Sequence, residues 1–184
     1  MEIKIKDWQE RIEETTQAFL SSFGGLSPEE LSYKPDPKVW SIEENIQHLI
    51  VINESYFPIF QKLEEGTYEK PFIGNFSFLT KLLGNTILKS VSPENPKKLK
   101  TIPIWAPNKY HDGDAEALLK KFEDHQKEIS QWIGKLGPYL EKNQIIHSPA
   151  NKLIAYPLST ALEIITIHEK RHFNQAKKIL EQIK

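Results

Sequence analysis

The chain contains 184 residues, of which 39% are hydrophobic and 27% are charged, and its formal net charge is -1. A chain of this length can bury its own core without disulfides, so we expect one domain over residues 1–184. The near-neutral charge and a pI of about 6.6 provide neither a basic field for nucleic acid nor a polybasic stripe for anionic lipid. We therefore expect no nucleic-acid partner and no membrane partner.

Two absences restrict the chemistry and the location further. The sequence has no cysteine, which excludes disulfides, thiolate metal ligands and a cysteine nucleophile. Residues 1–20 are a charged mixture without the apolar core of a signal peptide, and no apolar run reaches membrane-spanning length. These features predict a cytoplasmic protein.

The N-terminal third of the chain predicts helices with clear boundaries. The first helix ends at Gly24 and Gly25, and its apolar face is formed by Trp8, Ile12, Thr15, Phe19 and Phe23. A short helix should follow Ser27, because serine before proline is a typical helix start. The next long helix begins at Ser41, with Glu44 placed to complete a capping box, and extends to Gly66 unless Pro58 kinks or breaks it.

The middle of the chain predicts one helix, a crossover and another helix. Residues 76–89 have a helical pattern. Residues 91–113 contain four prolines, and we expect an ordered surface crossover that docks through Ile102, Ile104, Trp105 and Tyr110. A long helix then covers about residues 114–136 and ends at Gly137-Pro138.

The last helix is predicted to begin near Ser159 or Thr160, with Glu163 completing its cap, and to continue to the C-terminus. A loop that contains Pro149 and Pro157 precedes it, and no segment alternates with the period of a strand. The inner face of this helix is Ala161, Ile165, His168, His172, Ala176 and Ile179. We therefore predict an all-α fold, a four-helix bundle with a long Pro-rich crossover and one short extra helix.

The spacing of His168 and His172 is typical of a metal site. Residues four apart lie one above the other on a helix, so both imidazoles can reach one point. A buried pair needs a metal, a carboxylate or water to satisfy its ring nitrogens. His48 lies beside the main apolar face of its helix, and two readings stay open for it: a third ligand, or a half-buried histidine bonded to a carbonyl.

The remaining histidines favour simpler roles. His125 lies on an apolar helix face, where a core or exposed group is more common than a ligand, although a hydrogen bond to a metal ligand stays open. His111 and His147 lie in predicted loops, and we expect both to face solvent.

The segment HEKRH also satisfies the pattern H-E-x-x-H of zinc proteases. A metzincin needs a glycine and a third histidine at the positions where this chain has Gln175 and Lys178. A third ligand far downstream, as in other zinc proteases, is hard to place because only twelve residues follow His172. Peptidase chemistry is therefore disfavoured. We expect Glu169 to be a solvated carboxylate beside the site, and it is a weak candidate for proton transfer.

Two motifs together resemble the DinB superfamily, which includes YfiT-like metal-dependent hydrolases and bacillithiol S-transferases. Residues 37–49 read PKVWSIEENIQHL, similar to the family's tryptophan-serine start and helical histidine. Residues 168–175 read HEKRHFNQ, similar to its closing histidine pair followed by glutamine. The resemblance implies a bundle, often a homodimer, that holds one divalent metal on His48, His168 and His172. It also places Asn45 and Gln175 near the pocket.

Three functions are open from these observations. Three nitrogen ligands with a vacant position are typical of catalytic metal sites, with zinc or nickel expected first and iron or manganese as further options. The first hypothesis is a transferase that activates a low-molecular-weight thiol such as bacillithiol for attack on an electrophile. The second is a hydrolase of a small amide or ester that uses metal-bound water, with Glu169 or a residue that contacts a metal ligand as the base. The third is a bundle that binds a metal or small ligand without turnover.

Overall fold

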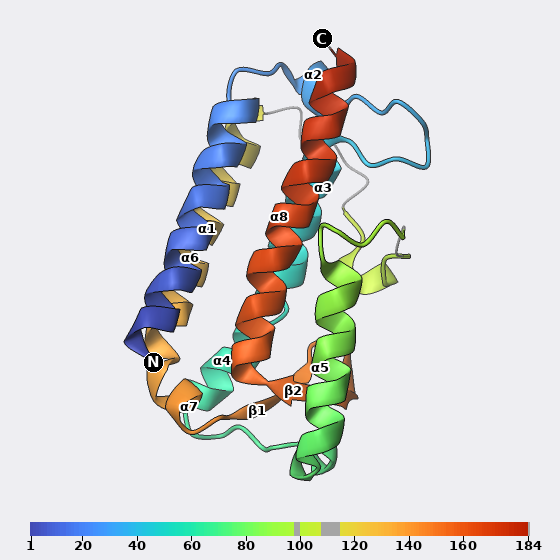
Figure 1. The fold of residues 1–184 in the computed structure, drawn as a ribbon. Coiled ribbons are helices and arrows are strands. Elements are labelled where there is room, and N and C mark those ends of the chain that lie inside the picture. Colours follow the sequence, from blue (N-terminus) through green and yellow to red (C-terminus); the bar gives the residue numbers. More distant parts are fainter. Residues whose placement is uncertain (98–99, 108–114, 184) are drawn as a thin grey trace.

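A computed structural model describes residues 1–97, 100–107 and 115–183 of the chain (Figure 1). In the first half, the helices are α1 (Glu2–Phe23), α2 (Pro28–Ser32), α3 (Ile42–Glu54), α4 (Phe57–Glu64), the 3-10 turn η1 (Phe72–Asn75) and α5 (Ser77–Val91). The second half contains η2 (Pro103–Trp105), α6 (Ala115–Lys135), α7 (Gly137–Glu141), the strands β1 (Ile145–Ser148) and β2 (Asn151–Pro157), and α8 (Leu158–Ile183).

The long helices pack side by side as a bundle. α1 contacts α6 and α8, and α3 contacts the same two helices, so these four enclose a shared interior. α5 packs against α8 and β2 on the outside of this group (Figure 1). The predicted all-α class is confirmed. The predicted count of four stays a prediction, because α5 also runs along α8.

The predicted helix starts in the N-terminal third are confirmed in detail. Ser41 Oγ accepts a hydrogen bond from the Glu44 amide, and the Glu44 carboxylate accepts one from the Ser41 amide, which completes the capping box. Ser27 begins α2 in the same way. The helix expected to reach Gly66 is broken as Pro58 suggested: α3 ends at Glu54, and α4 carries the proline in its first turn.

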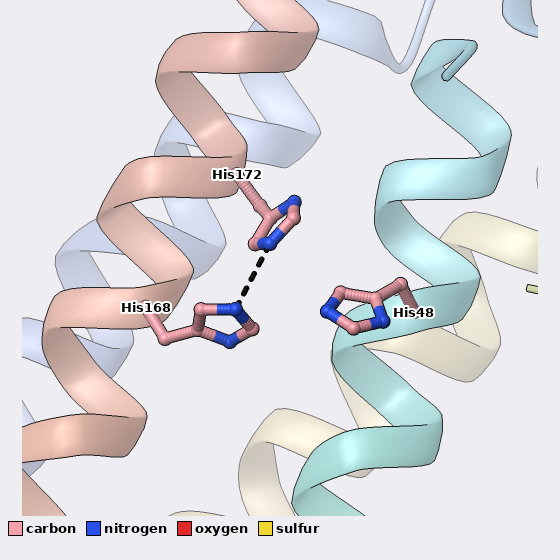
Figure 2. Close-up of side chains that lie close together, drawn as sticks. All are labelled: His48, His168 and His172. Atoms are coloured by element: carbon pink, nitrogen blue, oxygen red, sulfur yellow. Dashed lines mark hydrogen bonds between the residues drawn. The ribbon is translucent and has the colours of Figure 1, made fainter. Parts of the chain in front are cut away.

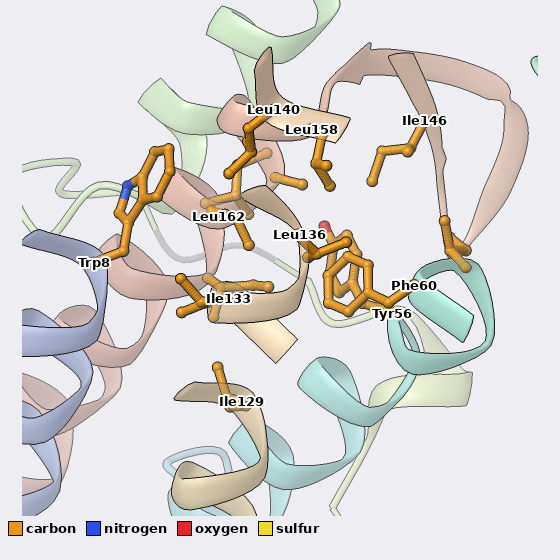
Figure 3. Close-up of a cluster of buried hydrophobic side chains, with 14 of the residues drawn as sticks. Trp8, Tyr56, Phe60, Ile129, Ile133, Leu136, Leu140, Ile146, Leu158 and Leu162 are labelled. Atoms are coloured by element: carbon orange, nitrogen blue, oxygen red, sulfur yellow. The ribbon is translucent and has the colours of Figure 1, made fainter. Parts of the chain in front are cut away.

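Two apolar clusters fill the interior. The cluster in Figure 3 lies where α1, α4, α6, α7 and α8 meet the strands, and its largest side chains include Trp8, Tyr56, Phe60, Ile133 and Leu162. The second cluster packs Phe19 against Phe23 and Phe122, with ring centroids 5.5 and 4.8 Å apart, and continues to Ile46 and Leu49 of α3. One position on α1 differs from the prediction: Thr16 is buried, whereas Thr15 is only half-buried.

The segment before α8 was predicted as a loop, and this prediction is wrong. β1 and β2 form an antiparallel hairpin, with a register irregularity between His147 and Ser148. The burial of β2 runs from exposed at its start to buried at Ala155 and Tyr156 rather than alternating, so the sequence shows no strand period. The expected cap by Glu163 is also wrong: its carboxylate accepts a hydrogen bond from Trp8 Nε1 at 2.8 Å and pairs with Arg11 at 3.0 Å.

The crossover departs from the prediction as well. Ile102 and Ile104 are exposed rather than docked, whereas Trp105 is half-buried. Tyr110 and His111 lie outside the described residues. Among the helices that the structure describes, none combines the length and the apolar character needed to cross a membrane.

Candidate metal centre

Three histidines from two distant parts of the chain meet inside the bundle. His48 extends from α3 toward α8, and His168 and His172 extend from successive turns of α8 toward it (Figure 2). All three side chains are buried, and one ring nitrogen from each lies within 4.8 Å of those of the other two. His48 therefore joins the pair in space, and metal binding by the three histidines stays a prediction.

The local sequence explains how the rings converge. His168 and His172 occupy the inner face of α8 together with Ala161, Ile165, Ala176 and Ile179, all of which are buried as predicted. α3 packs against both α6 and α8, so two sides of this helix are covered. His48 lies on the side toward α8, away from the apolar row of Ile46 and Leu49. His48 is therefore buried although it lies beside the main apolar face of α3, because α8 covers that side of the helix.

Hydrogen bonds fix which nitrogen of His172 is free. Asn45 Nδ2 donates to the Ser41 carbonyl at 2.7 Å, so Asn45 Oδ1 is left to accept from His172 Nδ1 at 2.7 Å. His172 Nδ1 must therefore carry the proton, because an amide oxygen can only accept. The Nε2 lone pair of His172 then points away from Asn45, into the cluster.

His48 is fixed in the same way from the crossover. Its Nδ1 lies 2.6 Å from the carbonyl oxygen of Trp105, which can only accept. The Nε2 atom of His48 is therefore the one with a free lone pair. The two readings proposed for His48 are compatible, because a carbonyl bond at Nδ1 orients the ring and leaves Nε2 as a ligand.

The spacing of the nitrogens suits one small cation. The Nε2 atoms of His168 and His172 are hydrogen-bonded at 3.0 Å (Figure 2). Because Nε2 of His172 carries the lone pair, Nε2 of His168 donates, and its proton must shift to Nδ1 before His168 can bind a cation through Nε2. Two nitrogens bound to a tetrahedral Zn²⁺ at about 2.0–2.1 Å lie roughly 3.3 Å from each other, so a few tenths of an ångström of movement brings the pair into register. Three imidazoles without thiolate suit zinc and nickel and also accept iron and copper.

The electrostatic environment keeps the rings in the form that binds metal. Burial is the main reason that the pKa of each histidine is lowered: below its ordinary value for His48, to about 3 for His168, and well below its ordinary value for His172. The histidines also disfavour each other's protonation. Neutral imidazole is the ligand form, so each ring has one lone pair at neutral pH, and that of His168 lies on Nδ1 while its Nε2 donates to His172.

An indole ring borders the cluster. The centroid of Trp40 lies 4.8 Å from that of His48 and 5.8 Å from that of His172, and it is stacked on the latter. Trp40 directly precedes the Ser41 cap, so the start of α3 sets both the indole and Asn45 beside the histidines. The half-buried ring shields this side of the cluster from water.

Glu169 differs from its prediction. It is fully buried rather than solvated, and its oxygens accept hydrogen bonds from Asn53 Nδ2 and Gln126 Nε2, each at 2.9 Å. Burial raises the pKa of its carboxyl to about 8, although both amides act in the opposite direction. These contacts direct the carboxyl toward α3 and α6 within the core. Its role in proton transfer stays a prediction, without support from the described hydrogen bonds.

Of the other residues considered in the sequence, one contacts the histidine cluster and three do so in no described hydrogen bond. Asn45 contacts the site as expected, whereas Gln175 is half-buried one turn beyond His172 and its role stays a prediction. His147 is half-buried in β1 and stacked on Tyr68, so its predicted solvent-facing position is wrong. His125 is buried outside the cluster beside Phe57, and neither ring nitrogen has a partner among the described residues. A hydrogen bond from His125 to a metal ligand is therefore not observed.

Sequence reasoning missed Arg171, which lies between the two histidines of α8. Its buried guanidinium donates to the carbonyls of Ser92 at 2.6 Å, Lys97 at 2.8 Å and Asn95 at 3.2 Å. It thereby holds the turn after α5 against α8 beside the cluster. The only sequence signal was a charged residue one position before an inward-facing histidine, which did not identify a partner.

The sequence profile of the DinB superfamily matches residues 11–176, which include all three histidines, Trp40 and Asn45. The chain belongs to the DinB superfamily. The resemblance drawn from the two motifs is confirmed at this level. No curated protein and no solved structure matches the chain. Membership of the DinB superfamily is consistent with metal binding at the histidine cluster.

Proposed function

We propose that this DinB superfamily protein binds one divalent metal ion through Nε2 of His48, His168 and His172 and leaves a coordination position open. The observation that carries the proposal is the convergence of three buried, neutral imidazoles whose other ring nitrogens are engaged at two of the three residues. Zinc and nickel fit this donor set best. Three protein ligands are too few to close a tetrahedral site, which distinguishes a catalytic site from a structural one.

The protein's own residues would prepare this site for reaction. A bound ion supplies Lewis acidity at the open position, which lowers the pKa of a thiol or water placed there. Asn45 and the Trp105 carbonyl hold two of the imidazole rings in orientation. Trp40 excludes water from one side. These contacts are formed before any ligand arrives, so binding requires little rearrangement.

We favour a transferase that activates a low-molecular-weight thiol, of the bacillithiol type, for attack on an electrophile. A thiol such as that of cysteine has a pKa of about 8.5, whereas bulk water ionises only near 15.7. The thiol therefore needs a much smaller shift and no protein base. The hydrolase alternative was to use Glu169, or another residue that contacts a metal ligand, as its base, and the Glu169 carboxyl is held by Asn53 and Gln126. That contact set makes the thiol reaction the better fit.

Metal content of purified variants tests the site itself. We expect wild-type protein to bind one equivalent of zinc or nickel, and His172→Ala to lose most of it. His125→Ala is the matched control, because His125 is equally buried but lies outside the cluster, and it should retain the metal. Nickel should also quench the fluorescence of Trp40 in the wild type. Full metal content in His172→Ala would refute the site.

A separate assay tests the reaction. Protein loaded with metal is mixed with thiols and an electrophile, with and without a chelator, and in parallel with small esters and amides without thiol. The proposal expects conjugation that the chelator abolishes. Ester or amide hydrolysis without thiol would support the hydrolase instead. Metal retention without any turnover would support the third hypothesis, a binding protein.

A further inference from the structure

An apolar surface lies on the outer side of α5 and the preceding turn η1. Five large side chains are exposed there within eleven residues, and we name them the α5 patch: Phe72, Phe76, Phe78, Leu79 and Leu82. Phe72 is 80% exposed, Phe78 74% and Leu82 51%. The rings of Phe72 and Phe76 contact each other, with centroids 5.5 Å apart. An exposed apolar cluster of this kind marks an interaction site.

The packing of α5 prevents the patch from turning inward. Thr80 and Gly84 face the bundle, and a Cβ atom at Gly84 would lie only 2.9 Å from Thr160 Cγ2 and 3.1 Å from Tyr156 Cβ. This close approach fixes the rotation of α5 against α8 and β2. Phe78 and Leu82 are four residues apart and lie on the other side of the helix. Their exposure is therefore a consequence of the way α5 packs against α8 and β2.

The charged residues of η1 and α5 all have one sign. Residues 72–91 contain Lys81 and Lys89 and no acidic residue. Both lysines are exposed, and neither has an ion pair within the described part of the chain. Over residues 72–107 there are five lysines and one glutamate, a net charge of +4, so the rest of the chain carries -5 of the total of -1. The neutral average thus conceals a basic segment.

This combination selects among partners. A second copy of the chain, docked through the same patch about a two-fold axis, would offer no acidic residue of η1 or α5 to pair with Lys81 and Lys89. An anionic lipid surface complements both features, because aromatic and aliphatic side chains enter the boundary between headgroups and acyl chains while lysines contact the headgroups. The expectation of no membrane partner rested on the net charge and on the lack of a spanning segment. Both observations concern the chain as a whole, so neither excludes lipid binding by a single exposed helix face.

We propose that the α5 patch docks this protein peripherally on an anionic lipid surface. Phe72, Phe78 and Leu82 enter the interface, and Lys81 and Lys89 pair with lipid phosphates. The inference is independent of the metal centre, because α5 supplies none of the three histidines.

Sedimentation with vesicles tests the proposal. Wild-type protein should bind vesicles that contain phosphatidylglycerol, bind phosphatidylcholine vesicles weakly, and dissociate at high salt. Phe78→Glu combined with Leu82→Glu should weaken binding at least about tenfold, and Lys81→Gln about fivefold, since each lysine near the surface is worth about that factor. Ile3→Glu is the matched control, because Ile3 is 86% exposed on α1, and it should bind like the wild type.

Two measurements complete the test. Circular dichroism and metal content show whether the double variant keeps its fold, and sedimentation velocity shows its oligomeric state. Absence of binding to phosphatidylglycerol vesicles by the wild type would overturn the proposal. It would also be overturned if the wild type is a dimer that the double variant dissociates without any lipid binding, which would identify the patch as a subunit interface. Lys81→Gln keeps the apolar residues and so tests the electrostatic part even if the double variant fails to fold.

Discussion

Substitution of Asn45 by alanine should show how much the hydrogen bond that orients His172 contributes to metal affinity, because His172 itself is retained. Asn45 Oδ1 accepts from His172 Nδ1 at 2.7 Å, and its Nδ2 donates to the Ser41 carbonyl at the same distance. Alanine removes both bonds and leaves His172 free to rotate or to change its protonated nitrogen. Loss of such a partner typically lowers metal affinity by about 10- to 100-fold, which corresponds to roughly 1.4–2.7 kcal/mol.

Asn53→Ala provides the matched control for this prediction. Asn53 is as buried as Asn45 and lies on the same helix, but it bonds Glu169 instead of a histidine. Both variants should lose about 1–3 kcal/mol of unfolding free energy in the metal-free protein, since each leaves a buried polar group unpaired. Only Asn45→Ala should weaken binding in a competition titration with a chromophoric chelator. Equal affinities in the two variants would refute the assigned role of Asn45.

Three further predictions concern stability and the crossover. Ser41→Ala removes the cap of α3 and should lower the unfolding free energy by about 1 kcal/mol in urea denaturation; an unchanged midpoint would contradict it. Burial lowers the pKa of His125 from 6.5 to about 4, so stability should fall as the pH falls from 6.5 through 4, by roughly 3 kcal/mol in total. His125→Leu should show a flatter profile than the wild type over this range, and parallel profiles would argue against this cause. Arg171→Gln should speed hydrogen exchange in residues 90–97, whereas Lys170→Gln, an exposed neighbour, should not.

Local signals in the sequence predicted most of the helical framework. Capping boxes at Ser27 and Ser41 and the proline at position 58 act within a few residues, so the chain itself carries their outcome. The pair His168 and His172 followed from helix geometry alone. His48 could be joined to them only through the resemblance to the DinB superfamily, because its burial depends on α3 being covered on two sides. Spacing within one helix does not reveal how many neighbours that helix has.

The features that sequence missed depend on contacts across the fold. β1 alternates in burial over only four residues, and β2 is buried only at Ala155 and Tyr156, so neither strand has an alternating pattern long enough to be recognised. Arg171 has no acidic partner among the described residues, and it bonds backbone carbonyls that lie 74 to 79 positions earlier. Backbone oxygens are present at every residue, so no side-chain pattern identifies the ones that a guanidinium will find.

Glu169 shows why the H-E-x-x-H pattern carries a different meaning in this fold. Adjacent residues on a helix are separated by about 100°, so when His168 and His172 face His48, Glu169 is turned away from the histidine cluster, toward Asn53 of α3 and Gln126 of α6. In this bundle the neighbouring direction is also covered, and there Asn53 and Gln126 occupy both carboxylate oxygens. No described contact therefore places the Glu169 carboxylate next to a water molecule at the histidine cluster. The same five letters on a helix whose Glu169 side is open would leave the glutamate in solvent beside the metal, so the cover of that side by α3 and α6 argues against a peptidase.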